Sequence, residues 1–200
     1  RLAVDAIIES LEPEIAGASS GTTDADIRGK LDRAFRLANE RIVSRRSGDP
    51  RLEKMGTTLV VAWLSGNQAH IAHIGDSRCY SLRGSQALCL TRDDTVVQSM
   101  LEDGSITRAD VPNVPFRNVL TRAVGTVEQA APSYRRETLD EGDVLLLCSD
   151  GLTDSVPEYR WLEIHKESDG MERTVQAMID AGLANEAGDN VSVVLLTLEY

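Results

Sequence analysis

The 200-residue sequence lacks any apolar run of the roughly 18 to 20 residues that a transmembrane helix needs. Its N-terminus lacks the basic segment and apolar stretch of a signal peptide. Basic residues are also in deficit, 21 against 32 acidic ones, and the formal net charge of -11 repels nucleic-acid phosphates and anionic lipid headgroups. We therefore expect a cytoplasmic protein that has neither nucleic acid nor membrane as a partner.

Cysteine and histidine are scarce as well. The three cysteines, Cys79, Cys89 and Cys148, are odd in number and lack CxxC spacing, so we expect reduced thiols, which suit a cytoplasmic protein. His70 and His73 lie in one strand-like run, and their odd separation sends the two rings to opposite faces of a sheet. We do not expect these histidines to share a metal ion.

The order of elements predicts an α+β fold. Helical spacing of apolar residues predicts two leading helices, about residues 1–17 and 27–46, with a polar linker at 18–23. Residues 56–91 then alternate as four strands in two hairpins, with turns at 65–67 and 83–85. Later segments predict, in order, a short helix capped by Asp93 or Asp94, strands at 134–139 and 144–149, helices at 158–166 and 171–187, and a strand at 191–200. We expect one domain of antiparallel sheets covered by helices.

Three aspartates share one setting, each at the end of a strand beside a glycine or another small turn residue. They are Asp76, Asp150 and Asp189. A single aspartate of this kind commonly caps a helix or forms a turn. Three carboxylates that converge at one edge of a fold need cations to offset their charge, and oxygen ligands select hard cations such as Mg²⁺ or Mn²⁺. We expect Gly151 to allow a sharp turn that leaves a ligand room, and Asn190 to hold the turn of Asp189.

Five segments extend the pattern: "GTTLVVAWLSGNQAHIAHIGDSRCYSL", "LTRDDTVVQ", "NVLTRAVGT", "DVLLLCSDGLTDSV" and "GDNVSVVLL". In this order they resemble the PP2C-type metal-dependent serine/threonine protein phosphatases (PPM family), and more closely the bacterial branch. The resemblance covers residues 56–198, and the two leading helices agree with it. It implies a four-layer αββα sandwich, in which two antiparallel sheets are flanked by helix pairs.

The resemblance also implies site residues. Asp150 and Asp189 match catalytic, metal-ligating aspartates of a centre with two, or possibly three, Mn²⁺ or Mg²⁺ ions, with Gly151 beside the metals. Asp76 matches an aspartate near a weaker additional metal, as a ligand or as a residue that holds one. Supporting positions are Gly75, Ser77 and Asn190. Residues 91–118 correspond to a flap beside the active site.

The implied reaction is dephosphorylation of phosphoserine and phosphothreonine proteins by attack of a metal-bridging hydroxide. No cysteine nucleophile is needed, and we expect Cys148 to lie in the core. The implied partners are phosphoproteins, either substrates of a serine/threonine kinase or the kinase itself. Two alternatives stay open: a sporulation- or stress-type phosphatase that acts on an anti-sigma factor antagonist, and a non-catalytic regulatory domain.

The sequence departs from the family pattern at two places. The N-terminal strands that bring an Asp-Gly metal ligand and a phosphate-binding arginine do not occur after Arg1. Either residues precede Arg1, or the protein is a degenerate member whose open sheet edges a homodimer or a partner would cover. The second departure is "TRDDT", where the family commonly has histidine and serine; we expect Asp94 and Thr95 to cap the next helix there. We interpret Asp154 as a turn residue or helix cap.

Overall fold

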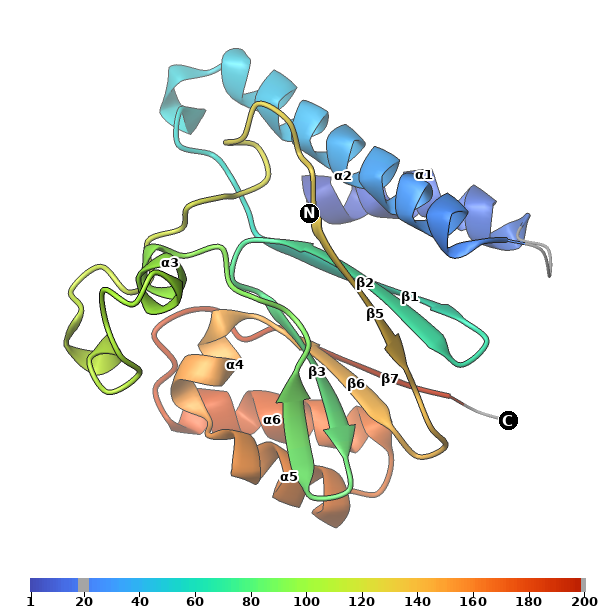
Figure 1. Cartoon of the computed structure of the whole chain (residues 1–200), viewed down its shortest axis with the longest axis vertical. Coiled ribbons are helices and arrows are strands. Elements are labelled where there is room, and N and C mark those ends of the chain that lie inside the picture. Colours follow the sequence, from blue (N-terminus) through green and yellow to red (C-terminus); the bar gives the residue numbers. More distant parts are fainter. Residues whose placement is uncertain (18–21, 199–200) are drawn as a thin grey trace. The chain divides into compact units, whose positions relative to one another are not determined.

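The computed structural model describes residues 1–17 and 22–198, so residues 18–21 of the predicted linker and the last two residues of the predicted final strand lie outside the described part. Its helices are α1 (Leu2–Ala16), α2 (Asp24–Ser47), α3 (Val96–Glu102), α4 (Asp150–Ser155), α5 (Glu158–Glu167) and α6 (Met171–Ala184), with 3-10 turns η1 (Pro50–Leu52) and η2 (Val111–Asn113). Its strands are β1 (Leu59–Ser65), β2 (Gln68–Ile74), β3 (Arg78–Arg83), β4 (Gln86–Cys89), β5 (Ser133–Thr138), β6 (Val144–Cys148) and β7 (Val193–Thr197) (Figure 1). They form two sheets, of orders β1-β2-β5 and β4-β3-β6-β7, and the predicted α+β class with antiparallel sheets is confirmed.

The described chain divides into two compact units, and each consists of several segments. The first unit comprises Arg1–Trp63, Ala72–Asp76 and Asp93–Tyr134. The second unit comprises Leu64–Ile71, Ser77–Arg92 and Arg135–Tyr200. A single domain over residues 1–200 stays a prediction.

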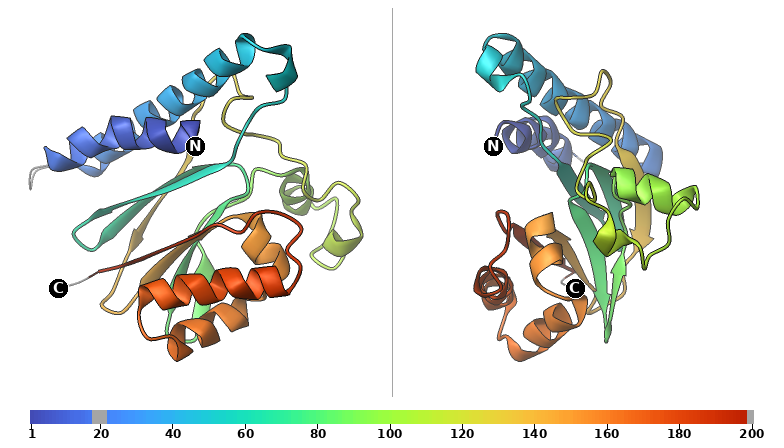
Figure 2. Two further views of the ribbon diagram at one scale, coloured as in Figure 1. Left: turned by 180° about the vertical axis from the view of Figure 1, so that it is seen from behind. Right: turned by 90° about the vertical axis from the view of Figure 1, so that its left-hand side faces the viewer.

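The core of the first unit lies along α1 and α2, which run side by side (Figure 2). The ion pairs Glu9–Arg41 (2.5 Å) and Glu14–Lys30 (3.0 Å) show that the two helices are antiparallel. Burying a large apolar side chain contributes about 1.5 to 3 kcal/mol, so the buried stripes of these helices stabilise the unit. The buried residues of this core include Leu31, Phe35, Ala38, Ile42, Leu59, Trp63 and Ile74.

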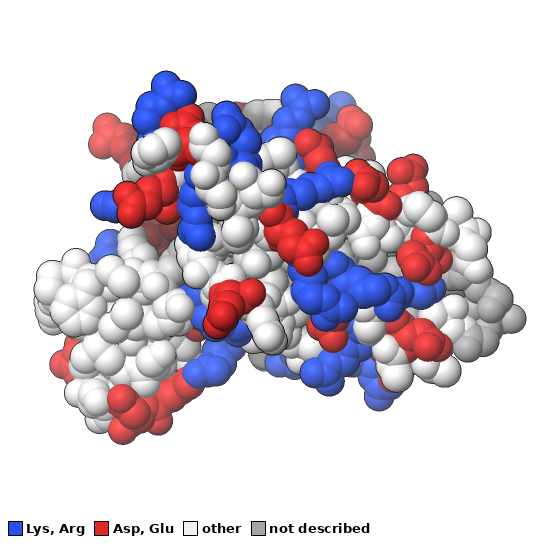
Figure 3. Space-filling view, turned by 90° about the horizontal axis from the view of Figure 1, so that it is seen from above, with Lys and Arg blue, Asp and Glu red and all other residues white. Residues whose placement is uncertain are grey.

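Ion pairs such as these distribute charge of both signs over the surface. On the face shown in Figure 3, lysine and arginine side chains lie interspersed with aspartate and glutamate side chains. Exposed pairs of this kind contribute little to stability, about 0 to 1 kcal/mol each. No helix among residues 1–17 and 22–198 is both long and apolar enough to cross a membrane.

The second unit packs α4, α5 and α6 against the sheet that contains β6. All five residues of β6 are buried, and alternate ones contact a cluster built around Trp161 and Met178. The rings of Tyr80 and Trp161 meet edge to face with centroids 5.0 Å apart. β6 pairs with β3 on one side and with β7 on the other, where Cys148 lies opposite Val193. The end of β6, where Asp150 follows, is therefore held by packing and by two neighbouring strands.

Three sequence predictions of local structure differ from the structure. Of the residues expected to cap α3, Thr95 is confirmed as the N-cap, because its hydroxyl accepts a hydrogen bond from the Gln98 N–H at 3.1 Å, whereas Asp93 and Asp94 are not caps. The helix α4 was not predicted at all, and Asp154 lies inside it, neither in a turn nor at a cap. The final predicted helix also ends early, since α6 stops at Ala184.

The cysteines agree with the prediction of reduced thiols. All three are free, with Cys79 and Cys148 buried and Cys89 partly buried. Burial raises the pKa of the Cys79 thiol to about 12, so this group stays protonated near neutral pH. A protonated, buried thiol is a poor nucleophile.

Candidate functional site

Asp150 lies two residues after the end of the buried strand β6. Ser149 is the N-cap residue of α4 and has an extended backbone, and Asp150 is the first residue of the helix. Asp150 is partly exposed, while Gly151 and Leu152 beside it are buried. The strand and the buried first turn of the helix thus fix the backbone that carries this carboxylate.

The loop that carries Asp189 lies against the same point. The Ser149 N–H donates to the Ser192 carbonyl at 3.1 Å, which continues the pairing of β6 with β7. The Ser149 hydroxyl donates to the Asn190 carbonyl at 2.9 Å and accepts from the Ser192 N–H at 3.0 Å. Three hydrogen bonds therefore join the residue before Asp150 to the residues after Asp189.

Gly151 permits this close approach. A Cβ atom at this position would lie 2.5 Å from the Asn190 carbonyl oxygen and 2.9 Å from its carbon, closer than side-chain atoms come in real structures. The side of Gly151 on which a side chain would stand is filled by the backbone of Asn190; room for a ligand beside Gly151 stays a prediction. A glycine is needed here because two segments of backbone meet.

Asn190 also contacts the carboxylate of Asp189. The backbone N–H of Asn190 donates to Oδ1 of Asp189 at 2.6 Å, and the side-chain Nδ2 of Asn190 lies 3.5 Å from the same oxygen. Asp189 is an exposed residue. The hydrogen bond from the Asn190 N–H therefore sets the orientation of a carboxylate at the surface.

The pKa of Asp150 depends on its surroundings. Partial burial raises the pKa of Asp150, the negative charges of Asp189 and Asp154 raise it further, and the Gly151 N–H acts in the opposite direction. The charge of Asp154 contributes because Asp154 lies four residues after Asp150 on α4, on the same face of the helix. Sequence reasoning missed this contribution, and the i,i+4 spacing would have revealed it only if the helix had been recognised. A cation at this point would offset the repulsion.

The donor set fits part of a metal site. Within residues 1–17 and 22–198, no group of three or more His, Cys, Asp or Glu side chains is arranged to hold a metal ion. Asp150 and Asp189 offer carboxylate oxygens, which hard cations such as Mg²⁺ and Mn²⁺ prefer. The pair therefore fits two of the six or so ligands that such a cation takes, and it needs further oxygen ligands.

Gly75 and Asp76 belong to the first unit, in the turn after β2. Gly75 has a positive φ of 104°, and a Cβ there would come 2.4 Å from Thr58. Its N–H donates to Oδ2 of Asp94 at 2.9 Å, and its carbonyl accepts from the Asp94 N–H at 3.0 Å. Asp94 therefore holds the turn that precedes Asp76, a role that the sequence did not reveal.

The remaining predicted positions are placed as follows. Asp76 is partly exposed, and Ser77, which begins a segment of the second unit, is partly exposed as well. Arg122 donates to Oδ1 of Asp94 at 3.3 Å and so supports the same turn. The convergence of Asp76 with Asp150 and Asp189 stays a prediction.

The predicted flap, residues 91–118, contains α3 and η2. An isolated antiparallel bridge between Thr95 and Leu120 closes its base, and the Val96 N–H donates to the Val119 carbonyl at 2.9 Å. Within the excursion, the Thr107 hydroxyl and N–H both donate to Asp110, at 2.6 and 2.8 Å. The segment is thus an ordered loop anchored at both ends, and its role beside an active site stays a prediction.

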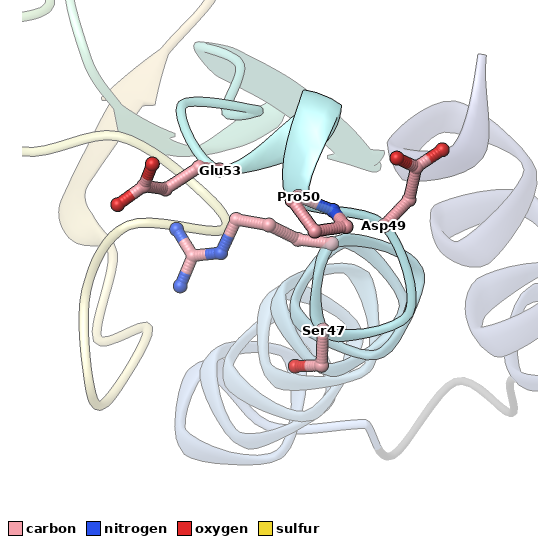
Figure 4. A pocket seen from close by; sticks show the side chains of 5 residues that line it. Ser47, Asp49, Pro50 and Glu53 are labelled. Atoms are coloured by element: carbon pink, nitrogen blue, oxygen red, sulfur yellow. The ribbon is translucent and has the colours of Figure 1, made fainter.

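A pocket of about 490 Å³ lies elsewhere in the first unit, where α2 ends (Figure 4). It contains none of the predicted site residues. Asp49 in its wall is paired with Arg51, whose guanidinium lowers the pKa of that carboxyl. The pocket is lined by Arg46, Ser47, Asp49, Pro50 and Glu53.

Comparison with known proteins gives a consistent result. The model of the protein phosphatase 2C family matches residues 1–186. Over 170 residues, 85% of this chain, the sequence is 37% identical to the serine/threonine protein phosphatase PstP of Mycobacterium tuberculosis, and it covers 33% of that protein. It is 34% identical over 174 residues, 87% of the chain, to the serine/threonine phosphatase stp of Listeria innocua, covering 69% of it. The chain thus spans about a third of the length of the mycobacterial protein.

Solved structures agree with these sequence matches. The crystal structure of the mycobacterial PstP superposes with a TM-score of 0.86 at 34% identity, covering 100% of this chain and 82% of that one. A second structure, the PstP catalytic domain in complex with two manganese ions, gives a TM-score of 0.81 at 32% identity, covering 97% and 79%. The predicted fold class and the resemblance on which it rested are confirmed.

Proposed function

Because the chain belongs to the protein phosphatase 2C family, we propose that it hydrolyses phosphoserine and phosphothreonine in proteins with the help of Mn²⁺ or Mg²⁺. One observation carries the proposal: three hydrogen bonds of Ser149 and the close backbone approach at Gly151 hold the segment of Asp150 against the loop of Asp189. The names of the relatives and the two manganese ions of the mycobacterial structure support the same reaction class.

In this proposal, Asp150 and Asp189 would hold divalent cations, two or three in number. Such cations would supply Lewis-acid activation of a water and of the phosphoryl oxygens. The chain itself keeps the carboxylates in place: Ser149 and Gly151 seat the loop of Asp189, and Asn190 orients its carboxylate. No covalent phosphoenzyme is required, in keeping with the buried thiols of Cys79 and Cys148.

The proposed substrates are cytoplasmic phosphoproteins, either targets of a serine/threonine kinase or the kinase itself. The net charge of -11 disfavours simple attraction of acidic phosphopeptides. Recognition would then depend on the metal ions and on the flap, residues 91–118.

The test is release of phosphate from a phosphothreonine peptide by the full-length protein with Mn²⁺. We expect activity that EDTA abolishes and that falls at least about 100-fold in Asp150→Asn and Asp189→Asn, because each substitution removes a charged ligand. Asp169→Asn is the matched control, since Asp169 is an exposed aspartate of the same unit that pairs with Arg173. Activity that survives EDTA, or that is equal in all three variants, would refute the proposal.

A second candidate function is a regulatory domain that binds phosphoproteins without hydrolysing them. The observation that favours it is that the described residues contain no complete metal-ligand group. The same assay separates the two candidates if peptide binding is measured alongside phosphate release. Binding of phosphorylated but not unphosphorylated peptide, without release of phosphate under any Mn²⁺ concentration, would favour the regulatory domain.

A further inference from the structure

Ser149 makes more contacts than strand pairing requires. Its backbone N–H donates to the Ser192 carbonyl, and this hydrogen bond extends the pairing of β6 and β7 by one residue. Its hydroxyl adds two more hydrogen bonds: it donates to the Asn190 carbonyl at 2.9 Å and accepts from the Ser192 N–H at 3.0 Å. The hydroxyl thus uses both its donor and its acceptor capacity on one loop.

These contacts join residues that neighbour the two aspartates in the chain. Ser149 precedes Asp150 in the chain, and Asn190 follows Asp189. The Asn190 carbonyl is held from two sides, by the Ser149 hydroxyl and by the close backbone of Gly151, while the Asn190 N–H holds Oδ1 of Asp189. A displacement of the loop at Asn190 therefore moves Asp189 relative to Asp150.

We propose that Ser149 is a positioning residue: its hydroxyl sets the separation of the Asp150 and Asp189 carboxylates and so the affinity of the pair for a divalent cation. This inference rests on the proposed function, because it takes the two carboxylates as metal ligands. Residues that orient metal ligands through hydrogen bonds typically change metal affinity about 10- to 100-fold when they are removed.

Loss of the Ser149 hydroxyl should loosen the loop of Asp189 without unfolding the protein. The loop around Asn190 and Ser192 is exposed, so in Ser149→Ala water can satisfy the carbonyl and the N–H that lose their partner. The backbone hydrogen bond to Ser192 stays, and the buried cluster beneath β6 is untouched. The main change is greater freedom of the loop that carries Asp189.

The test is Mn²⁺ binding by the full-length protein, measured from the electron paramagnetic resonance signal of free Mn²⁺. We expect Ser149→Ala to bind Mn²⁺ about tenfold more weakly and Ser149→Thr, which keeps the hydroxyl, to bind much as wild type does. In the phosphatase assay, the Mn²⁺ concentration for half-maximal activity should rise about tenfold in Ser149→Ala, with kcat at saturating Mn²⁺ changed less than twofold.

Ser155→Ala is the matched control. The Ser155 hydroxyl also lies on α4, but it donates to the Gly151 and Leu152 carbonyls within the helix and not to the loop of Asp189. It should leave Mn²⁺ affinity unchanged. When Asp189→Asn is already present, adding Ser149→Ala should cause no further loss of Mn²⁺ affinity, because the carboxylate through which Ser149 acts is gone.

Several outcomes would overturn the inference. They are wild-type Mn²⁺ affinity in a folded Ser149→Ala variant, an equal loss in Ser155→Ala, or no rescue by Ser149→Thr. Mn²⁺ binding by the wild-type protein without phosphate release would overturn the proposed function alone and leave the role of Ser149 standing. A wild-type protein that does not bind Mn²⁺ would overturn both.

Discussion

Gly151 provides a sharp test of how the site is built. In Gly151→Ala, the new Cβ would lie 2.5 Å from the Asn190 carbonyl oxygen, so that oxygen must retreat by about 0.9 Å to reach an ordinary contact of 3.4 Å. Overpacking of this size costs about 1 to 3 kcal/mol of folding free energy. In a protein of this size, that lowers Tm by about 2 to 4 °C per kcal/mol.

The larger effect should be on activity. The Asn190 backbone leads directly into Asp189, and a displacement near 1 Å at a catalytic site can cost on the order of 100-fold in rate. We therefore expect Gly151→Ala to lose about 100-fold in Mn²⁺-dependent phosphopeptide hydrolysis while it remains folded at 25 °C.

Gly188→Ala is the matched control for this prediction. Gly188 lies in the same loop, just before Asp189, but a Cβ there meets nothing within 4 Å. Its Tm and activity should stay close to those of wild type. If Gly151→Ala and Gly188→Ala behaved alike in both assays, the close backbone approach would have no functional role and the reasoning would be refuted.

Three further predictions concern single side chains. Asn39→Ala should lower the free energy of unfolding by roughly 2 to 4 kcal/mol in urea titrations, because the buried Gly125 N–H (2.6 Å) and the Val127 carbonyl (3.2 Å) lose their partner; a loss under about 0.5 kcal/mol would contradict this. Asp143→Asn should cost about 2 to 4 kcal/mol in the same assay, because the buried carboxylate accepts hydrogen bonds from Nε (3.0 Å) and Nη2 (2.5 Å) of Arg83. Arg83→Lys should also lose stability, because lysine cannot form this fork, and wild-type stability in that variant would argue against the forked geometry. Since the pKa of Asp150 is raised in the fold, its ionisation costs stability as the pH rises through that pKa. Without metal, the Tm of Asp150→Asn should exceed that of wild type at about pH 7, and this difference should shrink toward about pH 4. A difference in Tm that does not depend on pH would contradict the prediction.

The sequence predicted most of the long elements correctly, and the reason is local. The apolar stripes of α1 and α2 recur at helical spacing, and the hairpin turns place Gly66 and Gly84 at positive φ (56° and 60°), where glycine is favoured. The aspartates at strand ends were visible because a polar residue that ends an apolar run stands out in any sequence. These signals need only the neighbouring residues.

What the sequence did not reveal depends on contacts between distant segments. α4 has six residues, too few for a helical period to emerge. The hydrogen bonds of Ser149 span 41 and 43 residues, and those between Gly75 and Asp94 span 19. The sequence drew attention to Gly151, but the close approach of the Asn190 backbone follows only once the loop that packs against Gly151 is known. Hydrogen-bond partners of this kind follow from the fold and not from any short pattern.

The central claim is that Asp150 and Asp189 together hold a divalent cation. Anomalous diffraction from crystals of the full-length protein soaked in Mn²⁺ tests it most directly. The account predicts a manganese peak in contact with carboxylate oxygens of both residues in wild type, and loss of that peak in Asp150→Asn. A manganese site that contacts neither carboxylate, or an undiminished peak in the variant, would contradict it.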